Sequence, residues 1–193
     1  MKQAYIFIGR SGCGKGTQVK LLIEQLTQQG KDIFNLETGN QFREFIKKGT
    51  HSSQLAKKII EQGALQPEFL AVLMWASAMV EKVTGTEDFV LDGAPRKMAE
   101  AYTLDSALTF YKFTKPRVIF VNVSRGWAEE RLLGRGRSDD AMGEIKKRLD
   151  WYETEVAPVV EWYKNNPDYV FLDINGEQTI EEVHQEIMTK IAI

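Results

Sequence analysis

Short apolar runs recur along the chain and predict strands that are buried inside a sheet. The candidates fall at residues 5–8, 32–37, 89–92, 117–123 and 169–173. Runs without a regular polar break are typical of parallel strands, because helices cover both faces of such a sheet.

The segments between these runs carry apolar residues at helical spacing. Helices are predicted over 17–29, 40–48, 52–62 and 68–83. Four more are predicted: one that follows residue 92 and ends near residue 113, one that begins at residue 128, one over 142–165 with a break at Pro158, and one that begins near residue 179. This alternation predicts an α/β fold with a five-stranded parallel sheet covered by helices on both faces. Because residues 38–66 break the alternation, we expect them to form a small helical insert.

The composition narrows the class of protein. A length of 193 residues suits one domain spanning 1–193, and a net charge of −2 argues against a nucleic-acid or membrane partner held by bulk charge. One cysteine and two histidines exclude an intrachain disulfide and a zinc site. No signal-peptide pattern or membrane-spanning run is present, so we expect a cytoplasmic protein. We also expect it to be a monomer.

A glycine-rich stretch follows the first predicted strand and precedes the first predicted helix. Gly9, Gly14 and Lys15 have the spacing G-x-x-x-x-G-K of a phosphate-binding loop. Its backbone N–H groups and helix N-terminus would face phosphate oxygens, and Lys15 would reach the β- and γ-phosphates. A plain turn with a solvated lysine is the alternative, and the strand and helix on either side disfavour it. Gly16 stands where Ser or Thr usually binds Mg²⁺, and Thr17 comes one place later.

Six of the nine arginines in the chain fall in three short stretches. Arg43 and Arg96 each lie just beyond a predicted strand end, and one block contains Arg131, Arg135, Arg137 and Arg148. Ligands of an open parallel sheet bind outside the carboxyl ends of the strands, and guanidinium groups clamp phosphate oxygens. The pattern indicates a reaction between polyphosphates. Solvated surface ion pairs are the alternative, which we favour for Arg117 and Arg125.

At these residues the chain resembles an adenylate kinase of the nucleoside monophosphate kinase family. "GRSGCGKGT" matches the family's "GxPGxGKGT", "ETGNQFR" its "STGDxxR", "GALQP" its "G-x-L-V-P" and "DGAPR" its "DGFPR". "RLLGRGRSDD" is a compressed form of its "RLLxRGxxxGRxDD", and "DINGEQTIEEV" is also similar. The resemblance implies a P-loop kinase fold and the reaction of ATP with AMP to give two ADP, with Mg²⁺.

The resemblance implies a donor side that holds ATP. Its phosphates would be bound by Gly12, Cys13, Gly14, Lys15, Gly16 and Thr17. Arg131 would stack on the ATP base. Asp92 would orient Mg²⁺ through water, although a strand-end turn residue is the alternative. We interpret the Cys13 side chain as a small tolerated group, without a catalytic role.

The resemblance implies an acceptor side for the monophosphate. It would be formed by Thr38, Gly39, Arg43, Gln66, Gly93, Arg96 and Glu100, with Arg137 and Arg148 also contacting the substrate. Arg43 and Arg96 would bind the acceptor phosphate. The catalytic residues would be Lys15, Arg96, Arg135, Arg137 and Arg148. Asp139 and Asp140 would either position these arginines or cap the following helix.

Several positions depart from the family pattern. Ser11 replaces Pro, Asn40 replaces Asp and Ala94 replaces Phe. Only Gly136 separates Arg135 from Arg137, so residues 131–141 would form a vestigial lid turn. We therefore expect the insert at 38–66 to be the monophosphate-binding segment and the main mobile element, closing over AMP. Two groups of apolar residues are interpreted as core rather than ligand contacts: Trp151 with Tyr152, and Trp75 with Met74 and Met79.

Glu100 stands where family members that use AMP have glutamine. An amide can donate to adenine N1 and accept from its N6 amine, whereas a carboxylate can only accept. We predict AMP as the preferred acceptor with weakened discrimination against GMP, and we hypothesise that Gln66 or a water supplies the missing donor. A UMP/CMP or GMP kinase and a non-catalytic ATP-binding switch remain alternatives. The complete set of arginines disfavours the switch.

Overall fold

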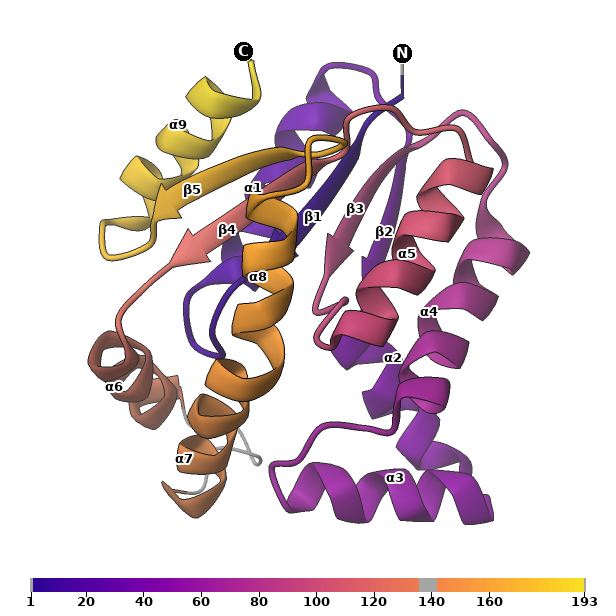
Figure 1. Cartoon of the computed structure of the whole chain (residues 1–193), viewed down its shortest axis with the longest axis vertical. Coiled ribbons are helices and arrows are strands. Elements are labelled where there is room, and N and C mark those ends of the chain that lie inside the picture. Colours follow the sequence, from indigo (N-terminus) through magenta and orange to yellow (C-terminus); the bar gives the residue numbers. More distant parts are fainter. Residues whose placement is uncertain (1, 136–141, 193) are drawn as a thin grey trace.

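The computed structural model describes residues 2–135 and 142–192, and its centre is a parallel sheet. The strands are β1 (Ala4–Ile8), β2 (Ile33–Glu37), β3 (Asp88–Asp92), β4 (Arg117–Asn122) and β5 (Val170–Asn175). They pair in the order β2-β3-β1-β4-β5, and every neighbouring pair is parallel. The central strand β1 is buried along its whole length, as its apolar sequence predicts. The predicted α/β class and the five-stranded sheet are confirmed (Figure 1).

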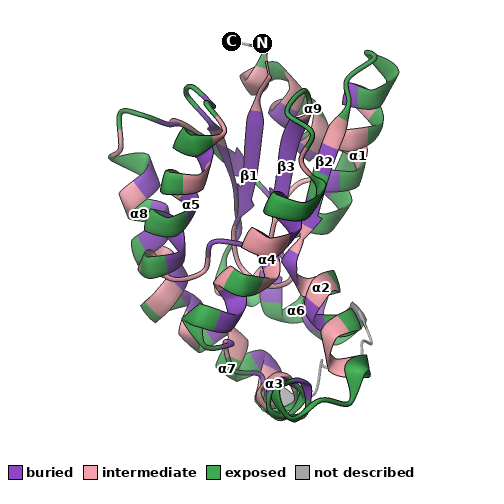
Figure 2. Cartoon of the chain, turned by 90° about the vertical axis from the view of Figure 1, so that its right-hand side faces the viewer, coloured by how far each residue is buried: buried purple, intermediate pink, exposed green. Residues whose placement is uncertain are grey.

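Helices pack on both faces of this sheet and form two hydrophobic clusters. One cluster unites the sheet with α4 (Glu68–Lys82), α5 (Met98–Phe110) and α8 (Ala157–Lys164). The other unites it with α1 (Lys15–Gln28), α6 (Arg125–Arg135), α7 (Met142–Trp151) and α9 (Ile180–Ile191). Figure 2 shows buried β1 and β3 flanked by helices that are exposed on their outer sides.

The expected helix over 142–165 is divided by a wider turn before Pro158. α7 is followed by a π-helix, Tyr152–Val156, and then by α8, in which Pro158 is the second residue. Proline has no N–H and cannot bond to the preceding turn, so the helical hydrogen bonding must change just before it. At the second position of α8 the missing N–H costs little.

The stretch that interrupts the βα alternation forms two short helices beyond the sheet. α2 (Thr38–Phe45) begins two residues earlier than predicted and continues into a 3₁₀ helix, Ile46–Lys48. α3 (His51–Glu61) follows, capped by the Thr50 side chain. The chain then returns past α7, where the Trp151 indole donates to the Gly63 carbonyl at 3.0 Å. α2 and α3 thus lie on one side of the carboxyl edge of the sheet, and α6 and α7 lie on the other (Figure 1).

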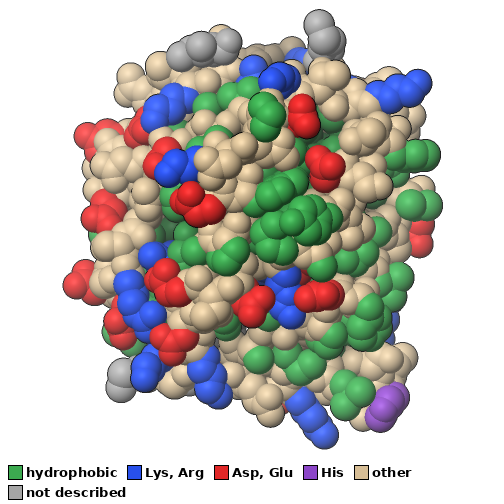
Figure 3. Space-filling model, in the orientation of Figure 1, with side chains coloured by type: hydrophobic (Ala, Val, Ile, Leu, Met, Phe, Trp, Pro, Cys, Tyr) green, Lys and Arg blue, Asp and Glu red, His purple; other side chains and the backbone are tan. Residues whose placement is uncertain are grey.

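Large exposed apolar side chains lie on the outer helices. Phe69, Leu73 and Val80 are exposed on α4, and Tyr102 on α5. In the view of Figure 3, apolar side chains gather over the side of the molecule that these helices cover. No helix in the described ranges is long and apolar enough to cross a membrane.

Candidate active site

A cleft with a volume of about 1310 Å³ opens at the carboxyl edge of the sheet. Its lining includes most of the predicted site residues: Gly12, Gly14, Lys15, Gly16, Thr17, Thr38, Gly39, Arg43, Gln66, Asp92, Gly93, Arg96, Glu100, Arg131 and Arg148. Arg137, Asp139, Asp140 and the side chain of Arg135 lie outside the part of the chain that the structure describes. The sequence motifs therefore converge on one cavity at the edge where open parallel sheets bind ligands.

The loop from β1 to α1 has the conformation that its glycines predict. Gly14 caps α1 with a φ of 91°, in the left-handed region, and a Cβ on Gly9 would stand 2.5 Å from the Val121 carbonyl oxygen. Lys15 Nζ donates to the carbonyls of Gly9 and Arg10 at 2.8 and 2.9 Å. The first turn of α1 has no acidic side chain and no side-chain cap. This end of the cleft therefore presents N–H dipoles and an ammonium group to an anion.

The Cys13 side chain lies behind the loop, in contrast to its glycine neighbours. It is 2% exposed, belongs to the hydrophobic cluster with Val19 and Leu22, and does not line the cleft. Its sulfur accepts a hydrogen bond from Lys15 Nζ at 3.5 Å. Any contact of Cys13 with a nucleotide would therefore come from its backbone.

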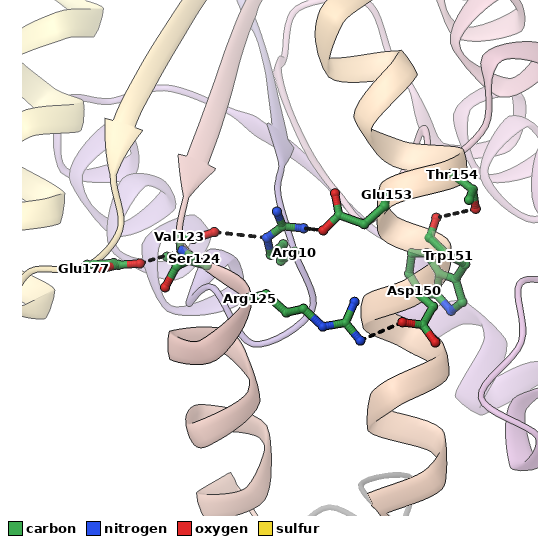
Figure 4. A network of polar contacts seen from close by, with 9 residues as sticks. All are labelled: Arg10, Val123, Ser124, Arg125, Asp150, Trp151, Glu153, Thr154 and Glu177. Carbon is green, nitrogen blue, oxygen red and sulfur yellow. Dashed lines mark hydrogen bonds and ion pairs between the residues drawn. The ribbon is translucent and has the colours of Figure 1, made fainter.

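Arg10 links the phosphate loop to distant segments of the chain by a hydrogen bond, an ion pair and a ring contact (Figure 4). Its Nε donates to the Val123 carbonyl at 3.0 Å, and its Nη1 pairs with Glu153 at 2.6 Å. The guanidinium carbon lies 4.0 Å from the centre of the Tyr152 ring. Sequence reasoning missed this residue, because it occupies an unrestricted position of the loop motif and its carboxylate partner is 143 residues away.

A second ion pair joins the two helices on that side of the cleft. Arg125 Nη2 on α6 lies 2.6 Å from Asp150 Oδ1 on α7 (Figure 4). Both side chains are exposed, so the interpretation of Arg125 as a surface ion-pair residue agrees with the structure. Exposed pairs contribute about 0–1 kcal/mol to stability.

Arg131 lies over an aromatic ring on the same face of α6. Its guanidinium carbon is 4.3 Å from the centre of the Trp127 ring, and both residues line the cleft. Trp127 was not singled out from the sequence, although the four-residue spacing on a predicted helix places the two side chains together. The pair offers a flat cationic and aromatic surface of the kind that stacks on a nucleotide base.

Arg96 and Arg148 bring two positive charges together at the middle of the cleft. Arg96 donates from Nε to the Gly93 carbonyl at 2.9 Å. Burial lowers the pKa of Arg96, the carboxylates of Glu100 and Asp92 raise it, and the charge of Arg148 lowers it again. Two guanidinium groups that repel each other are stabilised in their charged state when an anion lies between them. Each has the geometry to clamp phosphate oxygens.

Trp151 packs against the hydrophobic core and also lines the cleft, so its interpretation as a core residue was incomplete. Its ring is half-buried and lies 5.7 Å from the Arg96 guanidinium, while its indole nitrogen contacts Gly63. The π-helix begins at the next residue, and Trp151 is carried at the end of α7 beside the cleft. Tyr152 and Trp75 are buried in the core.

The start of α2 contributes a charged pair and a buried hydroxyl. Arg43 is held by Glu37 at 2.7 Å, but both side chains are about half exposed, so the pair can be exchanged for a phosphate at little cost. Glu37 was not singled out from the sequence. The Thr38 hydroxyl is buried and has no hydrogen-bond partner within residues 2–135 and 142–192. A buried unpaired hydroxyl in a cleft is a candidate contact for a ligand.

Glu100 and Gln66 contribute polar groups near the starts of α5 and α4. Glu100 is 3% exposed and accepts a hydrogen bond from the Arg96 backbone N–H at 3.3 Å. Burial raises the pKa of its carboxyl group, against the lowering effects of that hydrogen bond and of Arg96 and Lys97. The Gln66 amide NH₂ donates to the Ala56 carbonyl at 2.9 Å, and its oxygen is buried without a partner among the described residues. Because an amide NH₂ carries two N–H donors and one bonds to Ala56, the suggestion that Gln66 or a water supplies the missing donor stays a hypothesis.

The end of β3 offers one carboxylate to a metal ion. Asp92 Oδ2 would stand 3.7 Å from a Cβ on Gly16, so this oxygen faces the phosphate loop. Carboxylate and hydroxyl oxygens are ligands that Mg²⁺ accepts, and it keeps several waters or phosphate oxygens besides. Within the described residues, no cluster of three His, Cys, Asp or Glu could hold a metal by itself. The site therefore fits an ion carried in with a nucleotide, to which Asp92 would offer the carboxylate, directly or through water.

Comparison with known proteins agrees with this geometry. Residues 7–168 match the family model described as "Adenylate kinase". "Adenylate kinase 1" of Nostoc sp. is 33% identical over 94% of this chain and 95% of its own. The "Adenylate kinase" of Prochlorococcus marinus is 33% identical over 97% of both chains, and that of Corynebacterium glutamicum is 35% identical over 93% of both. The chain belongs to the adenylate kinase family.

Proposed function

We propose that the protein transfers the γ-phosphoryl group of ATP reversibly to AMP, giving two ADP, and that the cleft residues perform this reaction. The convergence of Arg96 and Arg148 beside the Lys15 loop is the observation that carries the proposal. A site that only bound ATP would not need two further, partly buried cations beyond the loop. Two polyphosphates that meet end to end would need them.

ATP would occupy the side of the cleft formed by the phosphate loop and α6. The backbone from Gly12 to Thr17 would face the phosphates, with Lys15 swinging from the loop carbonyls to the phosphate oxygens. The stack of Arg131 on Trp127 would support the adenine. Mg²⁺ held near Asp92 and Thr17 would neutralise charge on the phosphates.

AMP would occupy the side formed by α2 and the start of α5. Arg43 would exchange Glu37 for the acceptor phosphate, and Arg96 would bind the same phosphate from the opposite side. The unpaired Thr38 hydroxyl would donate to the substrate. Gly39 and Gly93 line this part of the cleft without side chains that would exclude the nucleotide.

The chemistry needs no protein nucleophile. A phosphate oxygen of AMP attacks the γ-phosphorus, and the bond to the β,γ-bridging oxygen breaks, so that both products are ADP. Arg148 and Arg96 would offset the charge that builds on the transferring group. The resemblance assigns the same role to Arg135 and Arg137.

We also propose that residues 38–66 form the acceptor-binding insert and that this insert closes over AMP, as expected from the sequence. Two contacts join the end of the insert to α7, the surface against which it would close: Trp151 with Gly63 at 3.0 Å, and Lys147 with the Gln62 carbonyl at 3.3 Å. α7 also carries Arg148, so closing the insert against α7 would bring acceptor and transfer residues together. A monomer is the active form that we propose, as expected from the sequence.

The test is ADP formation from ATP and Mg²⁺, followed with and without AMP by a coupled assay. The proposal expects ADP formation that depends on AMP, with CMP and UMP as poor acceptors. ATP binding with no AMP-dependent ADP would favour a non-catalytic ATP-binding module. Preference for CMP or UMP would favour a pyrimidine nucleotide kinase.

A further inference from the structure

We propose that Glu100 reads the acceptor base through its state of protonation, so that the protein phosphorylates GMP as well as AMP and the preference between them changes with pH. The inference rests on the proposed function, because it concerns the acceptor end of the same cleft. The inference depends on which hydrogen-bond donors and acceptors of Glu100 and Gln66 are available to a base at that end.

Glu100 combines burial with a place in the cleft lining. It stands in the first turn of α5, is 3% exposed, and lines the cavity with Arg96 and Gln66. Its Oε2 accepts a long hydrogen bond of 3.3 Å from the Arg96 backbone N–H. A carboxylate has about four lone-pair sites, so this contact leaves accepting capacity for a ligand.

Gln66 adds a second acceptor near the start of α4. One N–H of its amide donates to the Ala56 carbonyl, and its buried oxygen has no partner among the described residues. Glu68, two residues later, lies 3.6 Å from Lys97 and acts on the titration of Glu100. The Gln66 segment therefore lies beside the start of α5, where Glu100 stands.

The two purines present different groups to such atoms. Guanine carries N1–H and N2–H₂, which are donors, whereas adenine carries an acceptor at N1 and a donor at N6. An ionised Glu100 can accept both guanine donors. A protonated Glu100 can donate its O–H to adenine N1 and accept from N6 through its other oxygen. Each state of this residue therefore complements one purine.

Charges of both signs surround Glu100. Burial and the carboxylate of Glu68 raise the pKa of Glu100, while the Arg96 backbone and the charges of Arg96 and Lys97 lower it. From α8, the Tyr163 phenol faces the same region, and its own pKa is raised, first by burial and then by Asp105 and Glu100. Burial has the largest effect, so Glu100 holds its proton to a higher pH than an exposed glutamate would.

The reaction with GMP balances in the same way as that with AMP. A phosphate oxygen of GMP forms the new bond to the γ-phosphorus of ATP. The bond from that phosphorus to the β,γ-bridging oxygen breaks, and its electron pair leaves with ADP. The products are ADP and GDP, with no oxidant or other reactant.

The experiment measures kcat/KM for AMP and for GMP from about pH 5 to about pH 8 in wild type and in Glu100→Gln. The ratio of the two values cancels ionisations that both acceptors share, including their phosphates. In wild type the ratio of GMP to AMP should rise with pH by about ten- to a hundredfold. In Glu100→Gln it should stay low and flat, because an amide keeps one donor and one acceptor at every pH.

Glu68→Gln is the matched control, because it removes a neighbouring carboxylate that does not line the cleft. It should keep the rise and move it to lower pH, since Glu68 raises the pKa of Glu100. A flat ratio in wild type, or the same rise in Glu100→Gln, would overturn the inference. AMP turnover with such a result leaves the proposed function standing, whereas no AMP turnover at any pH contradicts the proposed function itself. Direct titration of each folded protein with AMP and GMP at both ends of the range checks that binding follows the same ratio.

Discussion

The phosphate end of the cleft is built mainly from backbone and fixed charge, whereas the base end of the acceptor side depends on two side chains. At the phosphate end, Gly9 and Gly14 set the loop conformation, and Lys15 is held by two loop carbonyls. At the base end, Glu100 and Gln66 decide which hydrogen bonds are available. Phosphate binding should therefore be sensitive to loss of charge and insensitive to the base, while base choice should respond to one atom or one proton.

The largest effect is expected at the phosphate end from Lys15→Ala. This change removes the ammonium group that would reach the transferring phosphate, so kcat/KM should fall by about 10³-fold or more for every nucleotide tested. The coupled ADP assay measures it. Lys164→Ala, an exposed change on α8, is the control and should leave turnover unchanged. Near-normal activity of Lys15→Ala would refute the assignment of the loop.

The next effect is expected between the two ends from Arg148→Ala. Loss of one of two guanidinium groups at the middle of the cleft should lower kcat by about 10²- to 10³-fold with a smaller change in KM. Arg125→Ala is the matched control. It removes an exposed ion pair between α6 and Asp150, which lies on α7 like Arg148. If both variants lose activity equally, the effect comes from displacement of α7 rather than from charge at the reacting phosphate.

A smaller effect is expected from Trp151→Phe at the closing contact. The change keeps a ring near Arg96 but removes the hydrogen bond to Gly63, which is worth about 1 kcal/mol. KM for AMP should rise about fivefold, with kcat and KM for ATP little changed. Steady-state kinetics measure it, with Trp162→Phe, a tryptophan outside the cleft lining, as control. An equal rise in KM for ATP would contradict the role of this contact in the acceptor side.

The smallest effect is expected on stability, from Glu100→Gln. The folded protein holds a proton on Glu100 above the unfolded pKa of about 4.5, since burial raises the folded pKa. In wild type this group therefore lowers the free energy of unfolding as pH rises through that window, and the loss persists above it. Denaturant titrations at several pH values should show the wild type falling relative to the variant as pH rises. A constant difference between the two would contradict the raised pKa.

Sequence reasoning predicted those parts of the molecule whose structure is determined by residues close together in the sequence. The buried strands are apolar because both faces are covered, and the glycine spacing of the loop follows from its backbone conformation. Arg43, Arg96 and Arg148 could be placed near one edge because parallel strands end there together. These predictions needed only the order of elements along the chain.

The remaining features depend on contacts between distant segments. Arg10 meets a carboxylate 143 residues away, and nothing near it in sequence indicates this. Trp151 was assigned to the core because apolar character does not distinguish a cleft wall from an interior. Gln66 was suggested, beside a water, as the missing donor, and only the fold shows that one of its N–H groups bonds to the Ala56 carbonyl.

The most direct test of a single cleft with a phosphate middle and two base ends is binding of a bisubstrate molecule, two adenosines joined by five phosphates. Calorimetric titration should give one molecule bound per chain. The complex should then bind neither ATP nor AMP, and Lys15→Ala and Arg148→Ala should each weaken its affinity. Binding that blocks ATP but leaves AMP able to bind would contradict the account, because the two nucleotides would not then share one cleft.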